Sequence, residues 1–141
     1  MYRIFDHHTA DIGLEVSGNT LEELFTEAAL GWKHLVLEDS PTAPKEKKTV
    51  QLTAPDLNDL LVQWLSELNF LLNAHFWVLD SIEQISIQKA NGTYTLNATI
   101  TGEPLDSDRH YIYFEIKAVT YHQLNIEKKG GKFRTRIIFD I

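Results

Sequence analysis

Residues 82–100 of the chain, IEQISIQKANGTYTLNATI, decide the fold. Two strand-like runs, 82–87 and 94–100, flank the dipeptide Asn91-Gly92. Asn and Gly both tolerate the positive φ angles that a two-residue hairpin turn requires. We therefore expect the two runs to pair as antiparallel strands across this turn.

The chain on either side of this hairpin contains further strand signals. In residues 12–17 apolar side chains alternate with small or polar ones, which is the period of a half-buried strand. Gly130-Gly131 joins the last two predicted strands. In addition to the hairpin, five strands are predicted at residues 2–5, 12–17, 49–53, 118–127 and 133–139.

Two helices are predicted in the first half of the chain. Thr20 and Glu23 have the spacing of a capping box, and the helix that they open should end before Glu38. Asp56 is the expected N-cap of the second helix. The apolar stripe of the second helix favours a buried core helix over a cofactor-binding one. The two stripes consist of Leu21, Leu24, Phe25, Ala28, Trp32 and Leu35, and of Leu57, Leu60, Leu61, Trp64, Leu65, Leu68 and Leu72.

Together these elements predict a two-layer α+β fold, with two helices packed on a largely antiparallel sheet of about seven strands. A chain of 141 residues is long enough for one good hydrophobic core. No linker, repeat or low-complexity segment interrupts it, and the polar stretch 41–48 is expected to be a surface loop. We therefore expect a single domain over residues 1–141.

The composition limits where the protein acts and which chemistry it carries. No stretch of about 18 apolar residues is present that could cross a membrane, and the first residues lack the apolar core of a secretory signal. The absence of cysteine excludes disulfides, thiolate metal ligands and a cysteine nucleophile. A cytoplasmic protein is the simplest interpretation.

The net charge restricts the partners. The chain has 13 Lys and Arg residues against 20 Asp and Glu residues, which gives a net charge of −7. Autonomous nucleic-acid binders usually carry a basic field, because neutralising phosphates supplies most of their affinity. This charge argues against tight, direct RNA binding. A protein of this kind would act on RNA only indirectly, through another protein.

The first candidate for a functional site is Asp11, which closes the polar segment 6–11, DHHTAD. Two histidines and two aspartates within six residues could ligate a metal ion. The same residues also suit a turn in which Asp and Thr hydrogen-bond to the backbone. Because Asp11 directly precedes an apolar strand, its carboxylate should lie at the rim of the sheet, where a ligand can reach it.

The second candidate is the end of the sequence, Asp140 and the α-carboxylate of Ile141. Chain ends fray unless they are tied down, so a last strand that ends in Ile is expected to be paired into the sheet. Two anionic groups held close together repel unless a cation joins them. With Asp11 as a third carboxylate, they would suit a hard cation such as Ca²⁺ or Mg²⁺. An exposed, solvated terminus is the alternative.

The third candidate is the segment from Arg109-His110 to residues 115–122, EIKAVTYH. It holds groups that could act as acids and bases, although such a run is more often a strand with a polar face. The sequence offers no nucleophile with its base and orienter, no phosphate-binding glycine loop and no zinc histidines at i, i+4. Catalysis by this chain alone is therefore weakly supported.

Read together, the three candidate segments and both helices resemble the archease family. The matching stretches occur in the family's order and span the chain, and the run 115–122 with the Asp-Ile terminus is the most specific part. Asp6-His7 and the loop 41–48 do not belong to the pattern, and neither affects the proposed ligands. The stretches are HTADIG at 8–13, TLEELF at 20–25, LLVQWLSEL at 60–68, RH at 109–110, EIKAVTYH at 115–122 and IFDI at 138–141.

The resemblance implies a function in tRNA splicing. Archeases are non-enzymatic activators of the RtcB-type RNA ligase that promote its guanylylation and repeated turnover, aided by a divalent metal, usually calcium. Carried over to this chain, Asp11, Asp140 and the terminal carboxylate of Ile141 would bind the metal. Lys117 would belong to the activating surface, and His8 lies in the matching motif without an assigned role.

Two other functions remain open at this stage. A small metal-dependent hydrolase or phosphoesterase could use Asp11 and Asp140 with a histidine such as His8 or His110, and would need a substrate pocket and open metal positions. A metal-free chaperone or scaffold would leave the carboxylates scattered in space. The separation of Asp11 and Asp140 distinguishes these possibilities best.

Overall fold

A computed structural model describes the backbone of residues 1–8 and 10–141, with all of their side chains except those of His7 and His8. Its elements follow the order β1 (Tyr2–His8), β2 (Asp11–Gly18), α1 (Leu21–Leu37), β3 (Glu46–Ala54), α2 (Leu57–His75), β4 (Trp77–Ala90), β5 (Thr93–Pro104), β6 (Ala118–Val119), β7 (Glu127–Lys129) and β8 (Lys132–Asp140).

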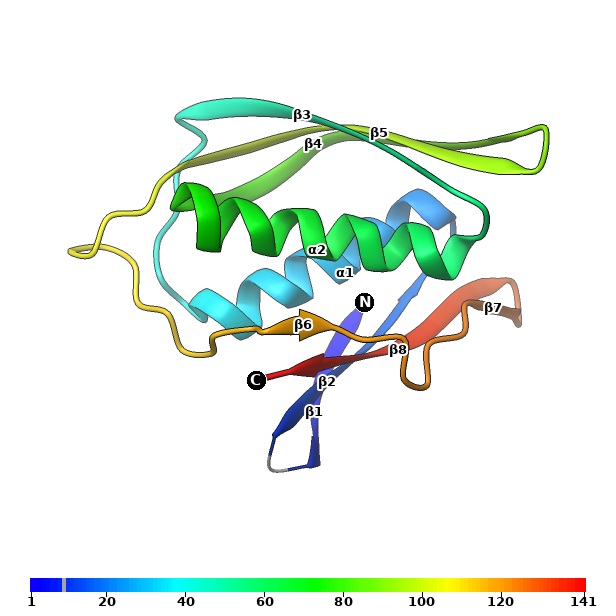
Figure 1. Ribbon diagram of the computed structural model, residues 1–141, viewed down its shortest axis with the longest axis horizontal. Helices are drawn as coiled ribbons and strands as arrows, with labels where there is room; N and C mark the ends of the chain where they lie inside the picture. Colours follow the sequence, from blue (N-terminus) through cyan, green and yellow to red (C-terminus); the bar gives the residue numbers. More distant parts are fainter. Residues whose placement is uncertain (9) are drawn as a thin grey trace.

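The strands form two antiparallel sheets, and the two helices lie between them (Figure 1). One sheet has the order β1-β2-β8-β6, with β7 also paired to β8, and the other has the order β3-β5-β4. The predicted α+β class, with two helices on largely antiparallel strands, is confirmed. The structure adds that the strands number eight in its described part and that they divide between two sheets.

Both helices begin at the predicted caps. The Thr20 hydroxyl accepts a hydrogen bond from the backbone N–H of Glu23 at 3.1 Å, and the Asp56 carboxylate accepts one from the N–H of Asp59 at 2.8 Å. These bonds satisfy donors that the first helical turn otherwise leaves without partners. The largest fully buried side chains are Trp32 of α1 and Trp64 of α2, as expected for helices covered by a sheet on each side.

Two glycine-containing turns set the registers of the hairpins. Asn91 and Gly92 have φ angles of 53° and 77°, and they connect β4 to β5 as predicted. Gly130 and Gly131, at 62° and 78°, connect β7 to β8 in the same way. Positive φ at both central residues is the conformation of the turn that matches the twist of paired strands.

The predicted strand 118–127 is wrong over most of its length, because only Ala118–Val119 and the start of β7 pair with β8. The N–H of Thr120 still donates to the carbonyl oxygen of Ile138 in β8 at 3.0 Å, but farther along the chain the backbone bonds to side chains. The N–H of Ile126 donates to Asn58 Oδ1 at 3.0 Å, and that of Asn125 donates to Thr135 Oγ1 at 3.1 Å. Gln123 has a φ of 59°, which is incompatible with a strand.

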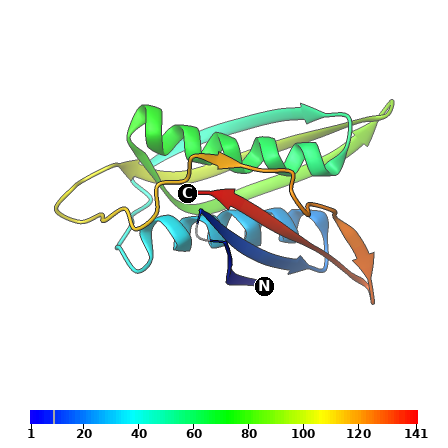
Figure 2. The same ribbon diagram turned by 60° about the horizontal axis from the view of Figure 1, so that its bottom comes forward.

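The strand β8 has a partner on each of its long sides, with β2 on one and β6 and β7 on the other (Figure 2). The last predicted strand is therefore paired into the sheet, as expected. Its inward side chains, Ile137 and Phe139, are fully buried in the core, while Arg134 and Arg136 face outward and are exposed. No helix among the described residues is long and apolar enough to cross a membrane.

Candidate metal centre

The pairing of β2 with β8 places Asp11 directly opposite Asp140. Residues opposite one another in an antiparallel pair extend their side chains from the same face, with their Cβ atoms about 4.5–5.5 Å apart. Both side chains are half-buried. The two aspartates, which are 129 positions apart in the numbering, thus form a carboxylate pair at the end of the central strand.

The backbone around this pair is fixed from both sides. The N–H of Ile141 donates to the carbonyl oxygen of Ala10 at 3.0 Å, and the N–H of Lys117 donates to the carbonyl oxygen of Asp140 at 2.8 Å. The Ile141 side chain packs against the core. The segment that carries the α-carboxylate of Ile141 is therefore anchored one residue away from Asp140.

Neither carboxylate of the pair has a hydrogen bond or an ion pair with any other side chain that the structure describes. Like charges opposite one another destabilise a sheet. Carboxylate oxygens are the donors that Ca²⁺ and Mg²⁺ prefer, so the donor set fits a divalent cation. Within residues 1–8 and 10–141, however, no described group of three or more His, Cys, Asp or Glu side chains could hold a metal. The third ligand that the sequence predicts is the α-carboxylate of Ile141.

Lys117 and Ala118 lie on the other side of Asp140. Ala118 is the strand partner of Asp140 in β6, so the two side chains extend from the same face. Lys117 is exposed, and its backbone is bonded to Asp140. The structure therefore brings together the segments of Asp11, Asp140, Ile141 and Lys117. The candidate residue His8 is the backbone partner of Asp11 in β1, and its side chain lies outside the described part.

The loop 105–117, which leads to Lys117, is held in place by a buried cluster of polar side chains around Glu103. The Glu103 side chain is 1% exposed. It accepts hydrogen bonds from the guanidinium of Arg109 and from the N–H of Ala43, the latter at 2.6 Å. Burial opposes ionisation of this carboxyl group, but the bonds from Arg109 and Ala43 and the charges of Arg109 and His110 outweigh it and lower the pKa of Glu103.

His110 belongs to this cluster and not to the aspartate pair. Its Nδ1 accepts a hydrogen bond from the N–H of Asp106 at 2.9 Å, and its buried Nε2 lies 3.5 Å from Glu103 without a hydrogen-bond partner in the described part. The imidazole is therefore enclosed between β5 and its own loop. Sequence reasoning noted Arg109-His110 but missed Glu103, whose only signal was an acidic residue six positions before Arg109.

The fold and this geometry define a class of protein: a small α+β domain that presents two opposed carboxylates on one face of a sheet. The sequence profile described as "Archease protein family (MTH1598/TM1083)" matches residues 2–141. The chain belongs to the archease family.

Individual relatives agree with this assignment. The chain is 37% identical over 134 residues to "Protein archease" of Methanosarcina mazei, covering 95% of this chain and 92% of the relative. It is 36% identical over 135 residues to "Protein archease" of Thermococcus gammatolerans, covering 95% and 94%.

Two solved structures share the fold. The solution structure of Methanobacterium thermoautotrophicum protein 1598 superposes with a TM-score of 0.85 at 31% identity, covering 99% of this chain and 98% of that one. The crystal structure of an archease and possible chaperone from Thermotoga maritima gives 0.57 at 26% identity, covering 95% and 93%.

Proposed function

We propose that this protein is a non-enzymatic, metal-binding activator of an RtcB-type RNA ligase in tRNA splicing, which promotes guanylylation and multiple turnover of that ligase. Membership of the archease family supports this function, and the words "possible chaperone" for the Thermotoga maritima relative agree with action on a protein partner. The observation that carries the proposal is the opposed carboxylate pair Asp11–Asp140 at the end of the central strand, to which no side chain in the described part of the chain bonds. A protein without cysteine suits the reducing cytoplasm, where we place it.

The proposed metal ligands are Asp11, Asp140 and the α-carboxylate of Ile141, with Ca²⁺ as the preferred ion and Mg²⁺ as the other candidate. Ca²⁺ takes 6–8 oxygen ligands, and three carboxylates offer at most six oxygens. A bound calcium ion would neutralise most of the charge of the pair and could accept oxygens from water or from a partner. The open face of the sheet gives such a partner access.

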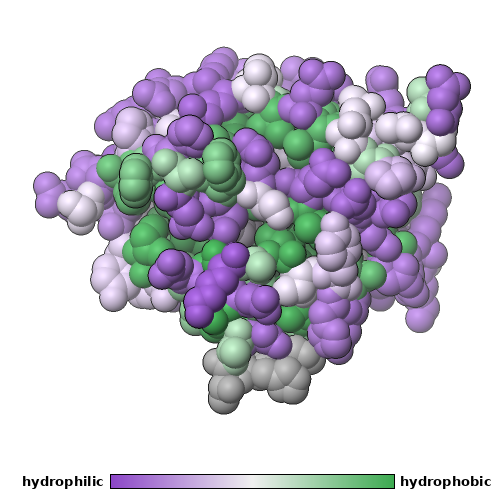
Figure 3. Space-filling model, in the orientation of Figure 1, coloured by the Kyte–Doolittle hydropathy of each residue, from purple (hydrophilic) through white to green (hydrophobic). Residues whose placement is uncertain are grey.

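The loop that leads to Lys117 offers contacts for a protein partner. The loop 105–117 exposes Tyr111 and Tyr113, which are 65% and 49% exposed and lie edge to face with ring centroids 4.6 Å apart. Exposed aromatic residues are common anchors of protein interfaces. In Figure 3, hydrophobic residues form several separate areas divided by hydrophilic ones. Lys117, at the end of the loop, would place a point charge near phosphate-bearing ligands of the ligase.

The hydrolase alternative has less support. Of the two histidines that it could use, His110 is buried and bonded within the Glu103 cluster. The side chain of His8, whose backbone pairs with Asp11, lies outside the described residues. A metal-free scaffold is the remaining alternative. It differs from the proposal in one measurable respect, because it predicts no specific binding of calcium.

Calcium titration by calorimetry and a multiple-turnover ligation assay together test the proposal. Asp11→Ala and Asp140→Ala should each weaken calcium binding at least about tenfold, because each removes one of three charges that hold the ion. Both should lower activation of the ligase in parallel. Asp39→Ala, which removes an exposed carboxylate just after α1, is the matched control and should change neither. Wild-type affinity in both site variants would exclude this pair as the metal site.

A further inference from the structure

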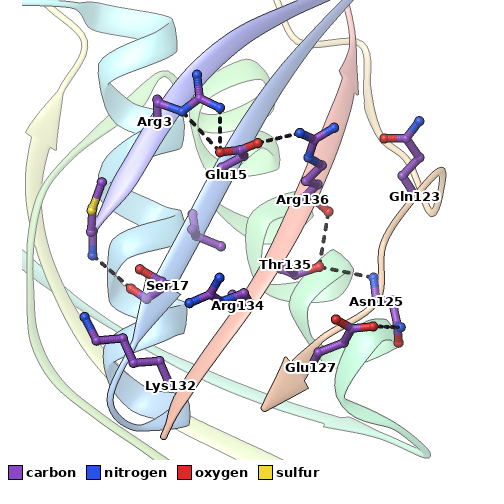
Figure 4. A pocket seen from close by; sticks show the side chains of 12 residues that line it. Arg3, Glu15, Ser17, Gln123, Asn125, Glu127, Lys132, Arg134, Thr135 and Arg136 are labelled. Atoms are coloured by element: carbon purple, nitrogen blue, oxygen red, sulfur yellow. Dashed lines mark hydrogen bonds and ion pairs between the residues drawn. The ribbon is translucent and has the colours of Figure 1, made fainter. Parts of the chain in front are cut away.

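A second feature of the same outer sheet face is a shallow groove of about 550 Å³ (Figure 4). It lies at the other end of β2 and β8 from the paired Asp11 and Asp140. Its floor is formed by outward side chains of β1, β2 and β8, and one wall by the segment 123–127. Among the residues that line the groove, four are Lys or Arg and two are Glu. This local excess of positive charge contrasts with the net charge of −7 for the whole chain.

Two of the four cations are held in fixed positions by one carboxylate. Arg3 donates from Nε and Nη2 to Oε2 of Glu15 at 3.1 and 2.7 Å, and Arg136 donates from Nη2 to Oε1 of Glu15 at 2.6 Å. The Arg136 guanidinium also lies over the Phe5 ring, 4.9 Å from its centroid. Glu15 neutralises one positive charge of the two, and each guanidinium retains N–H donors that point away from the pair.

The side chains of the other two cations, Lys132 and Arg134, are exposed and form no hydrogen bond or ion pair with the described residues. Together with Arg136 they occupy alternate positions of β8, so they extend from one face about 6.6 Å apart at a rise of about 3.3 Å per residue. The result is a straight row of three cations along the floor of the groove. A polymer with regularly repeating negative charges matches such a row better than a single small anion does.

The remaining lining favours a nucleic-acid backbone over an acidic protein segment. Ser17, Gln123, Asn125 and Thr135 are uncharged hydrogen-bonding residues, and no described aromatic side chain lines the groove. Phosphate and sugar contacts use this combination of Arg, Lys, Ser, Thr, Asn and Gln. Protein interfaces instead depend on buried aromatic anchors, and their centres are depleted of charge.

We propose that this groove binds the phosphate backbone of single-stranded RNA, without reading its sequence. That the polyanion is RNA rests on the proposed function. The groove and its positive charge are features of the structure and do not depend on that function. Asp11 and Ser17 extend from the same face of β2, six residues or about 20 Å apart. One open sheet face therefore carries the metal ligands at one end and the phosphate-binding row at the other. This adds a weak, direct contact to the indirect one through the ligase.

Fluorescence anisotropy of a labelled oligouridine, titrated with the intact protein across a range of KCl concentrations, tests the groove. A dissociation constant near 10⁻⁴ M at low salt is expected, and the slope of log K against log salt should be about −1.4 to −2.8 for two to four phosphate contacts. Lys132→Ala/Arg134→Ala should weaken binding at least about tenfold and reduce the slope by about 1.4. Both side chains are exposed and unbonded, so the variant should fold normally, as circular dichroism will show.

The control is Lys47→Ala/Lys89→Ala, which removes the same charge from exposed positions on the three-stranded sheet and should bind RNA like the wild type. Equal loss in both double variants would show only a general effect of net charge and would overturn the proposal. So would tighter binding of a polyglutamate peptide than of oligouridine, or no RNA binding at about 1 mM protein. Asp11→Ala should leave RNA binding intact, so a failure of the metal proposal can be told apart from a failure of this one.

Discussion

Replacing Glu103 by Gln removes one negative charge from a site that almost no water reaches. The carboxylate accepts hydrogen bonds from the Arg109 guanidinium and from the N–H of Ala43, the latter at 2.6 Å. Nζ of Lys45 and Nε2 of His110 each lie 3.5 Å from it. A Gln side chain keeps the shape but has only one acceptor oxygen. Its NH₂ group must then face a donor, either the guanidinium or the backbone N–H.

The cost follows from the burial of Glu103, whose side chain is 1% exposed. Removing one partner of a fully buried ion pair costs about 3–5 kcal/mol, and a hydrogen bond to a charged group contributes about 1.5–3 kcal/mol. The Arg109 side chain is 32% exposed, so water can solvate it in part once it is unpaired. We therefore expect Glu103→Gln to lower the free energy of unfolding by about 2–4 kcal/mol.

Urea denaturation at pH 7 measures this change, with Glu83→Gln as the control. Glu83 forms an exposed ion pair with Lys47 at 3.0 Å, in which the side chains are 45% and 64% exposed. Exposed pairs contribute less than about 1 kcal/mol. If the two variants lose equal stability, Glu103 does not hold the loop 105–117 in place.

The pH dependence gives the same prediction a second test. The pKa of Glu103 is lowered from its ordinary value of 4.5 in the folded protein. Above pH 4.5 the ionised Glu103 therefore contributes its full stabilisation to the fold. This stabilisation is lost as the pH falls through the pKa that Glu103 has in the folded protein. The difference in stability between wild type and Glu103→Gln should be constant near neutral pH and shrink below pH 4.5. A difference that grows on acidification would contradict this sign.

Three further perturbations address the sheet and its candidate metal. In calcium-free buffer, Asp11→Ala or Asp140→Ala should raise the melting temperature, since relieving opposed like charges gains about 0.2–1 kcal/mol; an unchanged or lower value would argue against repulsion within the pair. A C-terminal tag converts the Ile141 carboxylate to an amide and should impair ligase activation more than an N-terminal tag; equal activation by both tagged forms would remove Ile141 from the ligands. Gly13→Ala should cost about 1–3 kcal/mol in urea denaturation, because its Cβ would lie 2.2 Å from the Phe5 ring; a neutral effect would mean that Phe5 does not pack there.

The features that the sequence predicted correctly are those encoded within a few neighbouring residues. The caps at Thr20 and Asp56 depend on bonds spanning three positions, and the turn at Asn91-Gly92 depends on its own φ angles. Such signals are local, so a periodic pattern and a capping residue are sufficient to locate the element.

The features that the sequence left open depend on partners far along the chain. The break after Val119 is fixed by Asn58 and Thr135, and the Glu103 cluster by residues near 43 and 109. No local pattern records such contacts. The convergence of Asp11 with the end of the chain was expected from the family resemblance, and the register provides it; the metal itself stays a prediction.

The central position of β8 also has a consequence for the order of assembly during synthesis. Glu15 and Arg136, which are bonded across β2 and β8, stand 121 positions apart. The β1–β2 hairpin is synthesised early, and one of its edges stays unpaired while the helices and the whole of the other sheet are made. Pairings between such distant segments form slowly, and unpaired strand edges are prone to aggregate. The protein therefore acquires both its carboxylate pair and its cationic row in the same late step, when the last strand is inserted.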